Sequence, residues 1–136
     1  MKPALLATVV ATPLLLVLAA PVAAQPTDAA QLLAGYAAQA GAKPSAARGQ
    51  ALFNRRFSGA FASCADCHGA LPVKEGKDLV SEKPIAPLAP AAHPGRFDDK
   101  ARVDYRFRIN CKDVVGRECT ALEKADLLAW LTSLKP

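Results

Sequence analysis

The sequence predicts a small all-α domain, and three observations lead to this prediction. Four segments carry apolar residues at helical spacing, and a residue that suits a helix N-cap stands before each of them. The longest stretch between them, residues 70–96, is rich in proline, glycine and charge, which predicts an irregular loop. We find no internal repeat and no pair of segments that alternates as paired strands do.

The first two predicted helices lie in the first half of the chain. Thr27 suits the N-cap of a helix over residues 28–40, and Gly41 ends this helix. Ser45 follows a proline and suits the N-cap of a second helix over residues 46–54. The residues expected to face the core are Leu32, Leu33 and Tyr36 in the first helix, and Gly49 and Phe53 in the second.

The last two helices are predicted over residues 100–110 and 121–134, and Gly116 marks a turn between them. Thr120 and Glu123 form a capping box at the start of the last helix. The remaining assignments are an N-cap at Asp98 or Asp99 and core positions at Val103, Phe107, Ile109, Leu127, Leu128, Trp130 and Leu131.

A C-x-x-C-H run at residues 64–68 stands between the second helix and the loop. This run is the attachment signature of a c-type haem, because two thiols add to the two vinyl groups of one porphyrin. The imidazole that follows can reach the iron as an axial ligand. The sequence therefore predicts one covalent haem c held by Cys64, Cys67 and His68. The alternatives are a thioredoxin-like redox pair and a zinc site completed by Cys111, Cys119 and His93.

Residues 1–24 have the pattern of a secretory signal peptide. Lys2 gives a positive start, an apolar run follows over residues 5–18, and small residues at 22–24 suit cleavage before Gln25. The apolar run is short for a membrane-spanning helix. The sequence thus predicts export to the periplasm, where c-type haem is attached, and a mature cytochrome domain over residues 25–136 without a membrane span.

The chain contains four cysteines, and the predicted haem uses two of them. Cys111 and Cys119 remain, and the oxidising compartment favours a disulfide between them. The haem assignment therefore leaves one possible pairing.

The usual methionine partner of an electron-transfer cytochrome c is missing. Met1 is the only methionine, and it falls within the predicted signal peptide. From the residues alone, the candidates for the second axial position are Asn110, His93 and, more weakly, Lys112. Asn110 equally suits a helix C-cap, and His93 equally suits an exposed loop. An amide oxygen would be a weak ligand of ferrous iron, whereas a second histidine would close the iron to gases.

The order of helix, C-x-x-C-H, long loop and C-terminal helix resembles the class I cytochrome c fold. Further motifs resemble the sphaeroides haem proteins, a family of small monohaem cytochromes c. These motifs are Gly35-Tyr36, Arg48-Gly49-x-Ala51-Leu52-Phe53, Cys64-x-x-Cys67-His68-Gly69, Ile85-Ala86-Pro87-Leu88-Ala89-Pro90, Arg108-x-Asn110-Cys111 and Gly116-Arg117-x-Cys119-Thr120.

This resemblance implies a specific iron site. His68 would be the fifth ligand and Asn110 the sixth, beside a Cys111–Cys119 disulfide. The iron would be high-spin when reduced, with Asn110 displaced so that dioxygen or nitric oxide can bind. The electron donor would be a dihaem cytochrome c. His93 in the loop departs from the family pattern.

Two functions are therefore expected. The first is a periplasmic haem protein with an openable iron site, which binds a small ligand, accepts electrons from another cytochrome and could reduce dioxygen or nitric oxide. The second is a plain six-coordinate electron carrier.

The net charge of +5 suits an acidic redox partner, and Lys74, Lys83 or Arg96 could pair with haem propionates. Aromatic residues are only 6% of the chain, which argues against nucleic-acid binding.

Overall fold

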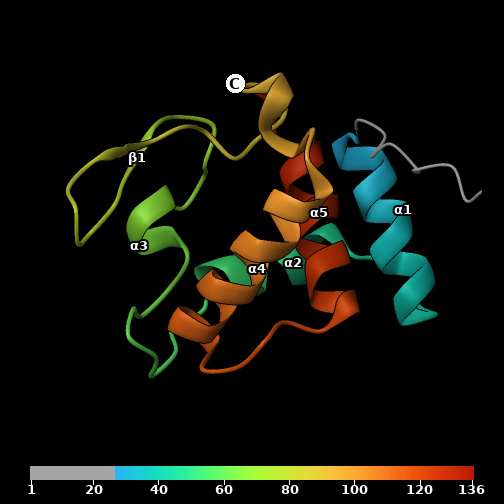
Figure 1. The fold of residues 1–136 in the computed structure, drawn as a ribbon, viewed down its shortest axis with the longest axis horizontal. Helices are drawn as coiled ribbons and strands as arrows, with labels where there is room; N and C mark the ends of the chain where they lie inside the picture. Colours follow the sequence, from blue (N-terminus) through green and yellow to red (C-terminus); the bar gives the residue numbers. More distant parts are fainter. Residues whose placement is uncertain (1–26) are drawn as a thin grey trace, which may run out of the picture.

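The computed structural model describes residues 27–136, so the predicted signal peptide and its cleavage site lie outside the described residues. The elements in chain order are α1 (Ala29–Ala40), α2 (Ala46–Asn54), α3 (Ala65–His68), β1 (Gly76–Lys77), β2 (Pro84–Ile85), the 3-10 turn η1 (Pro94–Phe97), α4 (Lys100–Val115) and α5 (Ala121–Ser133). The chain is mostly helical, as predicted (Figure 1). No helix in the described part is long and apolar enough to cross a membrane.

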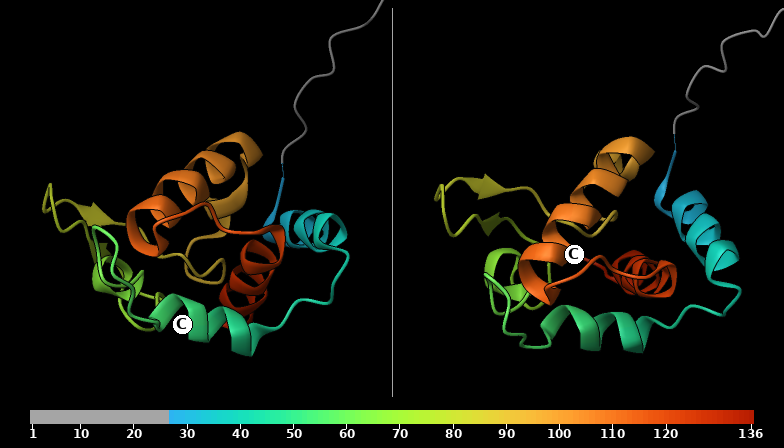
Figure 2. Two further views of the ribbon diagram at one scale, coloured as in Figure 1. Left: turned by 90° about the horizontal axis from the view of Figure 1, so that it is seen from below. Right: turned by 60° about the horizontal axis from the view of Figure 1, so that its bottom comes forward.

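The core is built where α5 packs against both α1 and α2, and α5 lies between these two helices (Figure 2). The buried side chains of this core include Leu32, Tyr36, Phe53, Val103, Leu127, Leu128, Trp130 and Leu131, all of which were predicted to face inward. Leu33 and Phe107 are only partly buried and pack against its edge. Each fully buried large apolar side chain contributes roughly 1.5–3 kcal/mol to folding.

The helices α2 and α5 cross in backbone contact at Gly49. A Cβ atom built on Gly49 would lie 2.0 Å from the backbone oxygen of Asp126 and 2.9 Å from the backbone nitrogen of Leu127. Real Cβ atoms do not approach a backbone oxygen so closely, because the overlap is strongly repulsive. The absence of a side chain at Gly49 therefore determines how near the two helices come.

A buried carboxylate holds this crossing together. Asp126 is 4% exposed, and its oxygens accept hydrogen bonds from the backbone N–H of Ser45 at 2.6 Å and from Nε and Nη2 of Arg48 at 2.7 and 2.8 Å. Arg48 also donates to the backbone oxygen of Lys43 at 2.9 Å. A buried charge is tolerated when it is paired and hydrogen-bonded in this way.

The N-cap of α1 is Asp28, and the prediction of Thr27 is wrong. The Asp28 carboxylate accepts from the backbone N–H of Gln31 at 2.8 Å, and the Gln31 side chain accepts from the backbone N–H of Asp28 at 3.3 Å. A carboxylate in this reciprocal arrangement is the stronger cap. Thr27 instead donates from Oγ1 to the backbone oxygen of Phe97 at 2.9 Å, which ties the start of the described chain to η1.

The helix α4 begins after the Asp99 cap, as predicted, but extends to Val115 rather than ending near Asn110. No helix-breaking residue occurs before Gly116, which takes the left-handed conformation at φ 79° and closes the last turn. Asn110 therefore lies inside α4 and is not a helix C-cap. The cap of α2 at Ser45 and the capping box of α5 at Thr120 are confirmed.

The loop over residues 70–96 contains one short strand pair, which the sequence pattern did not predict. In β1 and β2, Gly76 pairs with Ile85 and Lys77 with Pro84 in antiparallel register. Each strand has two residues, so no alternating pattern can develop in the sequence. Apart from the start of η1 at its end, the rest of this loop is irregular, as expected.

Replacing Gly49 by alanine should lower the free energy of unfolding of the holoprotein by about 2–3 kcal/mol, because the added methyl group forces α2 away from α5. Gly35→Ala is the matched control, since no atom lies within 4 Å of a Cβ built there. Because Gly35 is an exposed helical glycine, its replacement should stabilise the protein by about 0.5–1 kcal/mol. Denaturant titrations of both variants check the prediction, and equal effects would contradict it.

Candidate functional site

The residues of the C-x-x-C-H run lie on one short turn of helix. Asp66 accepts from the backbone N–H of Ser63 at 3.0 Å and from its hydroxyl at 2.9 Å, and Ser63 Oγ accepts from the backbone N–H of Asp66 at 3.2 Å. Gly69, at φ 75°, ends the turn with a bond from its N–H to the oxygen of Ala65 at 2.8 Å. These local bonds explain why the segment folds as a compact turn.

The helical spacing places Cys64 beside both Cys67 and His68, because residues three and four apart are neighbours on a helix. Both cysteines are half-buried, and neither is part of a disulfide. Burial raises the pKa of the Cys64 thiol to about 11. The structure thus gathers two free thiols and an imidazole on one short turn.

Burial also lowers the pKa of His68 to about 4, and the positive charge of Arg96 contributes to this effect. His68 is therefore neutral near pH 7, which is the form that binds a metal. The ring of His68 packs against Phe53 at 6.2 Å between centroids, and Phe53 packs against Trp130 at 4.9 Å. The turn is thereby connected to the helical core through aromatic contacts.

The helix α4 is fixed near its middle to α1. Tyr36 donates a hydrogen bond to Asp104, and the rings of Tyr36 and Phe107 meet edge-on at 5.8 Å. Burial of Tyr36, together with its bond to Asp104, raises the pKa of the Tyr36 hydroxyl. Asp104 also pairs with Lys100 on the preceding turn of α4.

The C-terminal part of α4 contacts the segment that leads into the C-x-x-C-H turn. The backbone N–H of Phe61 donates to the oxygen of Asp113 at 3.2 Å. A Cβ atom built on Gly59 would lie 2.4 Å from the backbone oxygen of Val114, so this segment lies directly against the helix end. In Figure 1, α4 lies between α3 and α1.

Asn110 lies in the interior of α4 with an exposed side chain. The next residue, Cys111, is joined to Cys119 by a disulfide, with the two Cα atoms 5.6 Å apart. Both cysteines are buried. The predicted pairing is thus present, and it attaches α4 one residue after Asn110 to the segment before α5.

The other candidate ligands have different surroundings. His93 is half-buried at the N-terminal side of η1, and its side chain caps no backbone group of that turn. Lys112 is exposed and pairs with Glu118 at 3.4 Å. Cys111 and Cys119 are bonded to each other, so they cannot complete a zinc site with the C-x-x-C-H run, and this alternative is wrong as proposed.

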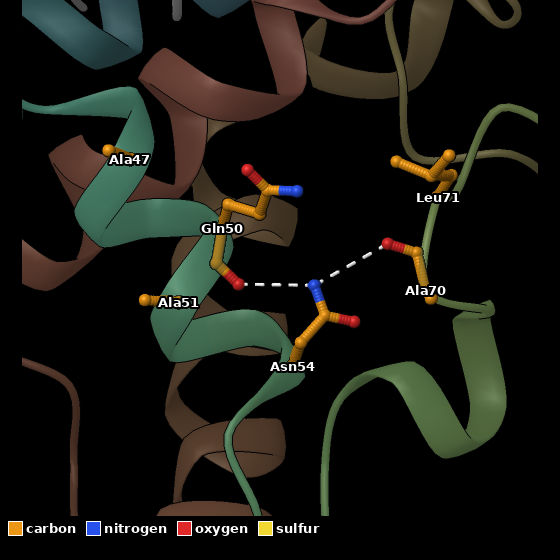
Figure 3. Close-up of a pocket in the computed structure, with 6 residues that line it drawn as sticks. All are labelled: Ala47, Gln50, Ala51, Asn54, Ala70 and Leu71. Carbon is orange, nitrogen blue, oxygen red and sulfur yellow. Dashed lines mark hydrogen bonds between the residues drawn. The ribbon is translucent and has the colours of Figure 1, made fainter.

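A separate groove lies on the outer side of α2. It has a volume of about 500 Å³ and is lined by Ala47, Gln50, Ala51, Asn54, Ala70 and Leu71 (Figure 3). Asn54 Nδ2 donates to the backbone oxygens of Gln50 at 3.1 Å and Ala70 at 3.5 Å across it. None of the predicted ligand residues lines this groove, so it is not the candidate site.

The donor set at the C-x-x-C-H turn fits a covalent haem c. Two unpaired, half-buried thiols and a neutral imidazole lie on one turn, and the imidazole packs against the apolar ring of Phe53. A thiol pair supplies the two thioether bonds that this haem requires, and an imidazole supplies one axial ligand.

Comparisons with known proteins agree with this chemistry. The model of a family described as "Domain of unknown function (DUF1924)" matches residues 39–131. Cytochrome c-type protein SHP of Cereibacter sphaeroides is 51% identical over 120 residues, which are 86% of this chain and 92% of that protein. Cytochrome c'' of Methylophilus methylotrophus is 42% identical over 97 residues, which are 68% of this chain and 67% of that protein.

Two solved structures also resemble the fold. The structure of oxidized SHP, described as an oxygen-binding cytochrome c, is similar with a TM-score of 0.75 and 50% identity, over 80% of this chain and 99% of that one. A solution structure of cytochrome c'', described in terms of haem-ligand detachment, has a TM-score of 0.71 and 36% identity, over 79% of this chain and 94% of that one. The chain therefore belongs to the DUF1924 family, and it is a monohaem c-type cytochrome with the fold of SHP and cytochrome c''.

Proposed function

We propose that Cys64 and Cys67 bind the haem through thioether bonds and that His68 is the fifth ligand of the iron. The position of these three residues on one turn, at spacings of three and four from Cys64, supports this assignment, as does the fact that the other two cysteines are already bonded. The haem supplies a redox-active iron that exchanges one electron and can take a small sixth ligand. Burial keeps the His68 imidazole neutral, so that one of its two ring nitrogens carries no proton and could bind the iron.

Asn110 is the sixth ligand in this proposal, and it is displaced when the iron is reduced. The single observation that carries this assignment is the position of Asn110, which places an amide on α4 one residue before the disulfide. The usual methionine ligand is missing, because Met1 is the only methionine of the chain. The SHP structure is described as that of an oxygen-binding cytochrome c, and the cytochrome c'' structure is described in terms of haem-ligand detachment, and both descriptions lend support. An amide oxygen is a hard, neutral donor and binds ferrous iron less well than ferric iron.

The anchors of α4 suggest which part of the molecule moves. Tyr36 holds the helix at Asp104, and the disulfide holds it at Cys111. Asn110 lies between these two attachments and is exposed. We expect the Asn110 side chain to rotate while the α4 backbone stays in place.

The physiological role that follows is that of a periplasmic cytochrome which accepts an electron from another haem protein, with a dihaem cytochrome c as the expected donor. The reduced form then binds dioxygen or nitric oxide at the position that Asn110 leaves. A basic chain, with a net charge of +5, suits an acidic donor surface.

Replacing both Cys64 and Cys67 by alanine should abolish covalent haem, because no thioether bond can then form. Haem staining after denaturing electrophoresis measures this directly. Replacing both Cys111 and Cys119 by serine is the matched control and should leave the stain intact. The control should lower the free energy of unfolding by about 2–3 kcal/mol, the chain-entropy estimate for so short a loop. A stained band in the first variant would contradict the proposed attachment.

Replacing Asn110 by valine should convert the ferric holoprotein to a five-coordinate or water-ligated high-spin form, because the amide donor is lost. The absorption spectrum and the electron paramagnetic resonance spectrum report this change. His93→Ala is the control and should leave both spectra unchanged. If only the His93 variant changes, then His93 is the sixth ligand and the protein is better described as a closed electron carrier.

A further inference from the structure

Arg96 is a half-buried cation at the end of the long loop, within η1. In the described part of the chain, the basic residues that form ion pairs are Arg48, Arg56, Lys77, Lys100, Arg102, Lys112 and Arg117. Arg96 is not among them, and within residues 27–136 its guanidinium makes no side-chain hydrogen bond. A guanidinium that is partly removed from water without an anion or acceptor is destabilised.

The surroundings of Arg96 add to this charge rather than compensate it. Burial lowers the pKa of Arg96, and the positive charges of Arg106 and Arg102 on α4 lower it further. Asp98 follows η1 directly, but it is already paired with Arg102. This part of the protein therefore carries an excess of positive charge, and one of its cations, Arg96, is half-buried.

The loop that carries Arg96 is bonded to the segment that follows the C-x-x-C-H turn. The backbone N–H of the fully buried Ala89 donates to the oxygen of Pro72 at 3.1 Å, and the oxygen of Ala89 accepts from the N–H of His93 at 3.0 Å. Figure 1 shows this loop passing from the α3 and β1 side of the molecule to the start of α4. The backbone N–H of Arg96 in turn donates to the oxygen of His93 at 3.0 Å. These backbone bonds connect Arg96 to Pro72, four residues after His68, on the side of the molecule that carries the proposed haem site.

We propose that the guanidinium of Arg96 binds a propionate carboxylate of the haem. A haem c brings two such carboxylates, and the planar fork of a guanidinium matches a carboxylate through two parallel hydrogen bonds. Lys74 and Lys83 are the other loop residues that could pair with a propionate. Both are exposed, so neither needs an anion to compensate for burial. The inference rests on the proposed haem attachment, and it assigns a role to a residue outside the C-x-x-C-H turn and the distal ligand.

The test is the pH dependence of the reduction potential of the Arg96→Leu holoprotein. An ionised propionate favours the oxidised iron, so the potential falls as the pH rises through the propionate pKa. Arg96 holds this pKa low, because an adjacent positive charge favours the ionised carboxylate. The inflection in the plot of potential against pH should therefore move upward by about one pH unit or more in Arg96→Leu. The other ionisable groups whose charges reach Arg96 are Arg102 and Arg106 on α4 and His68 on α3.

Arg106→Leu is the matched control, since it removes an exposed neighbouring arginine without a bound carboxylate. It should leave the inflection near its wild-type position. Arg96→Lys keeps the positive charge but loses the planar guanidinium, so it should shift the inflection less than Arg96→Leu does. It should still move the propionate bending band in the resonance Raman spectrum. This second variant carries the test if Arg96→Leu yields no holoprotein.

The two proposals fail in different ways. Wild-type protein without covalent haem would refute the haem attachment. An unchanged inflection in Arg96→Leu holoprotein, an equal shift in Arg106→Leu, or an unchanged propionate band in Arg96→Lys would refute the role of Arg96.

Discussion

The close crossing of α2 and α5 at Gly49 is the contact on which the rest of the structure depends. The backbones meet where a side chain would collide with Asp126, and the Asp126 carboxylate then binds the start of α2 through Ser45 and Arg48. This crossing brings Phe53 and Trp130 together, and Phe53 in turn supports the ring of His68. The position of the C-x-x-C-H turn relative to the core therefore follows from a glycine and from a buried carboxylate paired with Arg48, none of which belongs to the candidate site.

The two sides of the site are held by different kinds of interaction. The side with the C-x-x-C-H turn is fixed locally by Ser63 and Asp66, and covalent attachment of the haem would tie it further. The other side is the long helix α4, which is anchored by Tyr36 and by the disulfide at Cys111. If Asn110 is the sixth ligand, as proposed, these anchors on both sides of it leave rotation of its side chain as the least costly way to open the iron, since no helix has to move.

The parts of the fold that the sequence predicted well are those determined by neighbouring residues. Helix caps such as Ser45 and Thr120, and the gathering of the C-x-x-C-H residues on one turn, depend on spacings of three and four. Contacts between distant residues could not be predicted. The bond from Thr27 to Phe97 is one such contact, and it frees the cap position for Asp28. The length of α4 was underestimated because asparagine favours helix ends, whereas here the helix continues to the first glycine.

The most direct test of an iron site with a displaceable ligand is the absorption spectrum of the reduced wild-type holoprotein, recorded before and after addition of carbon monoxide. If Asn110 leaves the iron on reduction, the ferrous protein is high-spin and its Soret band shifts when carbon monoxide binds. A ferrous spectrum that stays low-spin and does not respond to carbon monoxide would show that a strong sixth ligand remains in place, and it would contradict the proposed function.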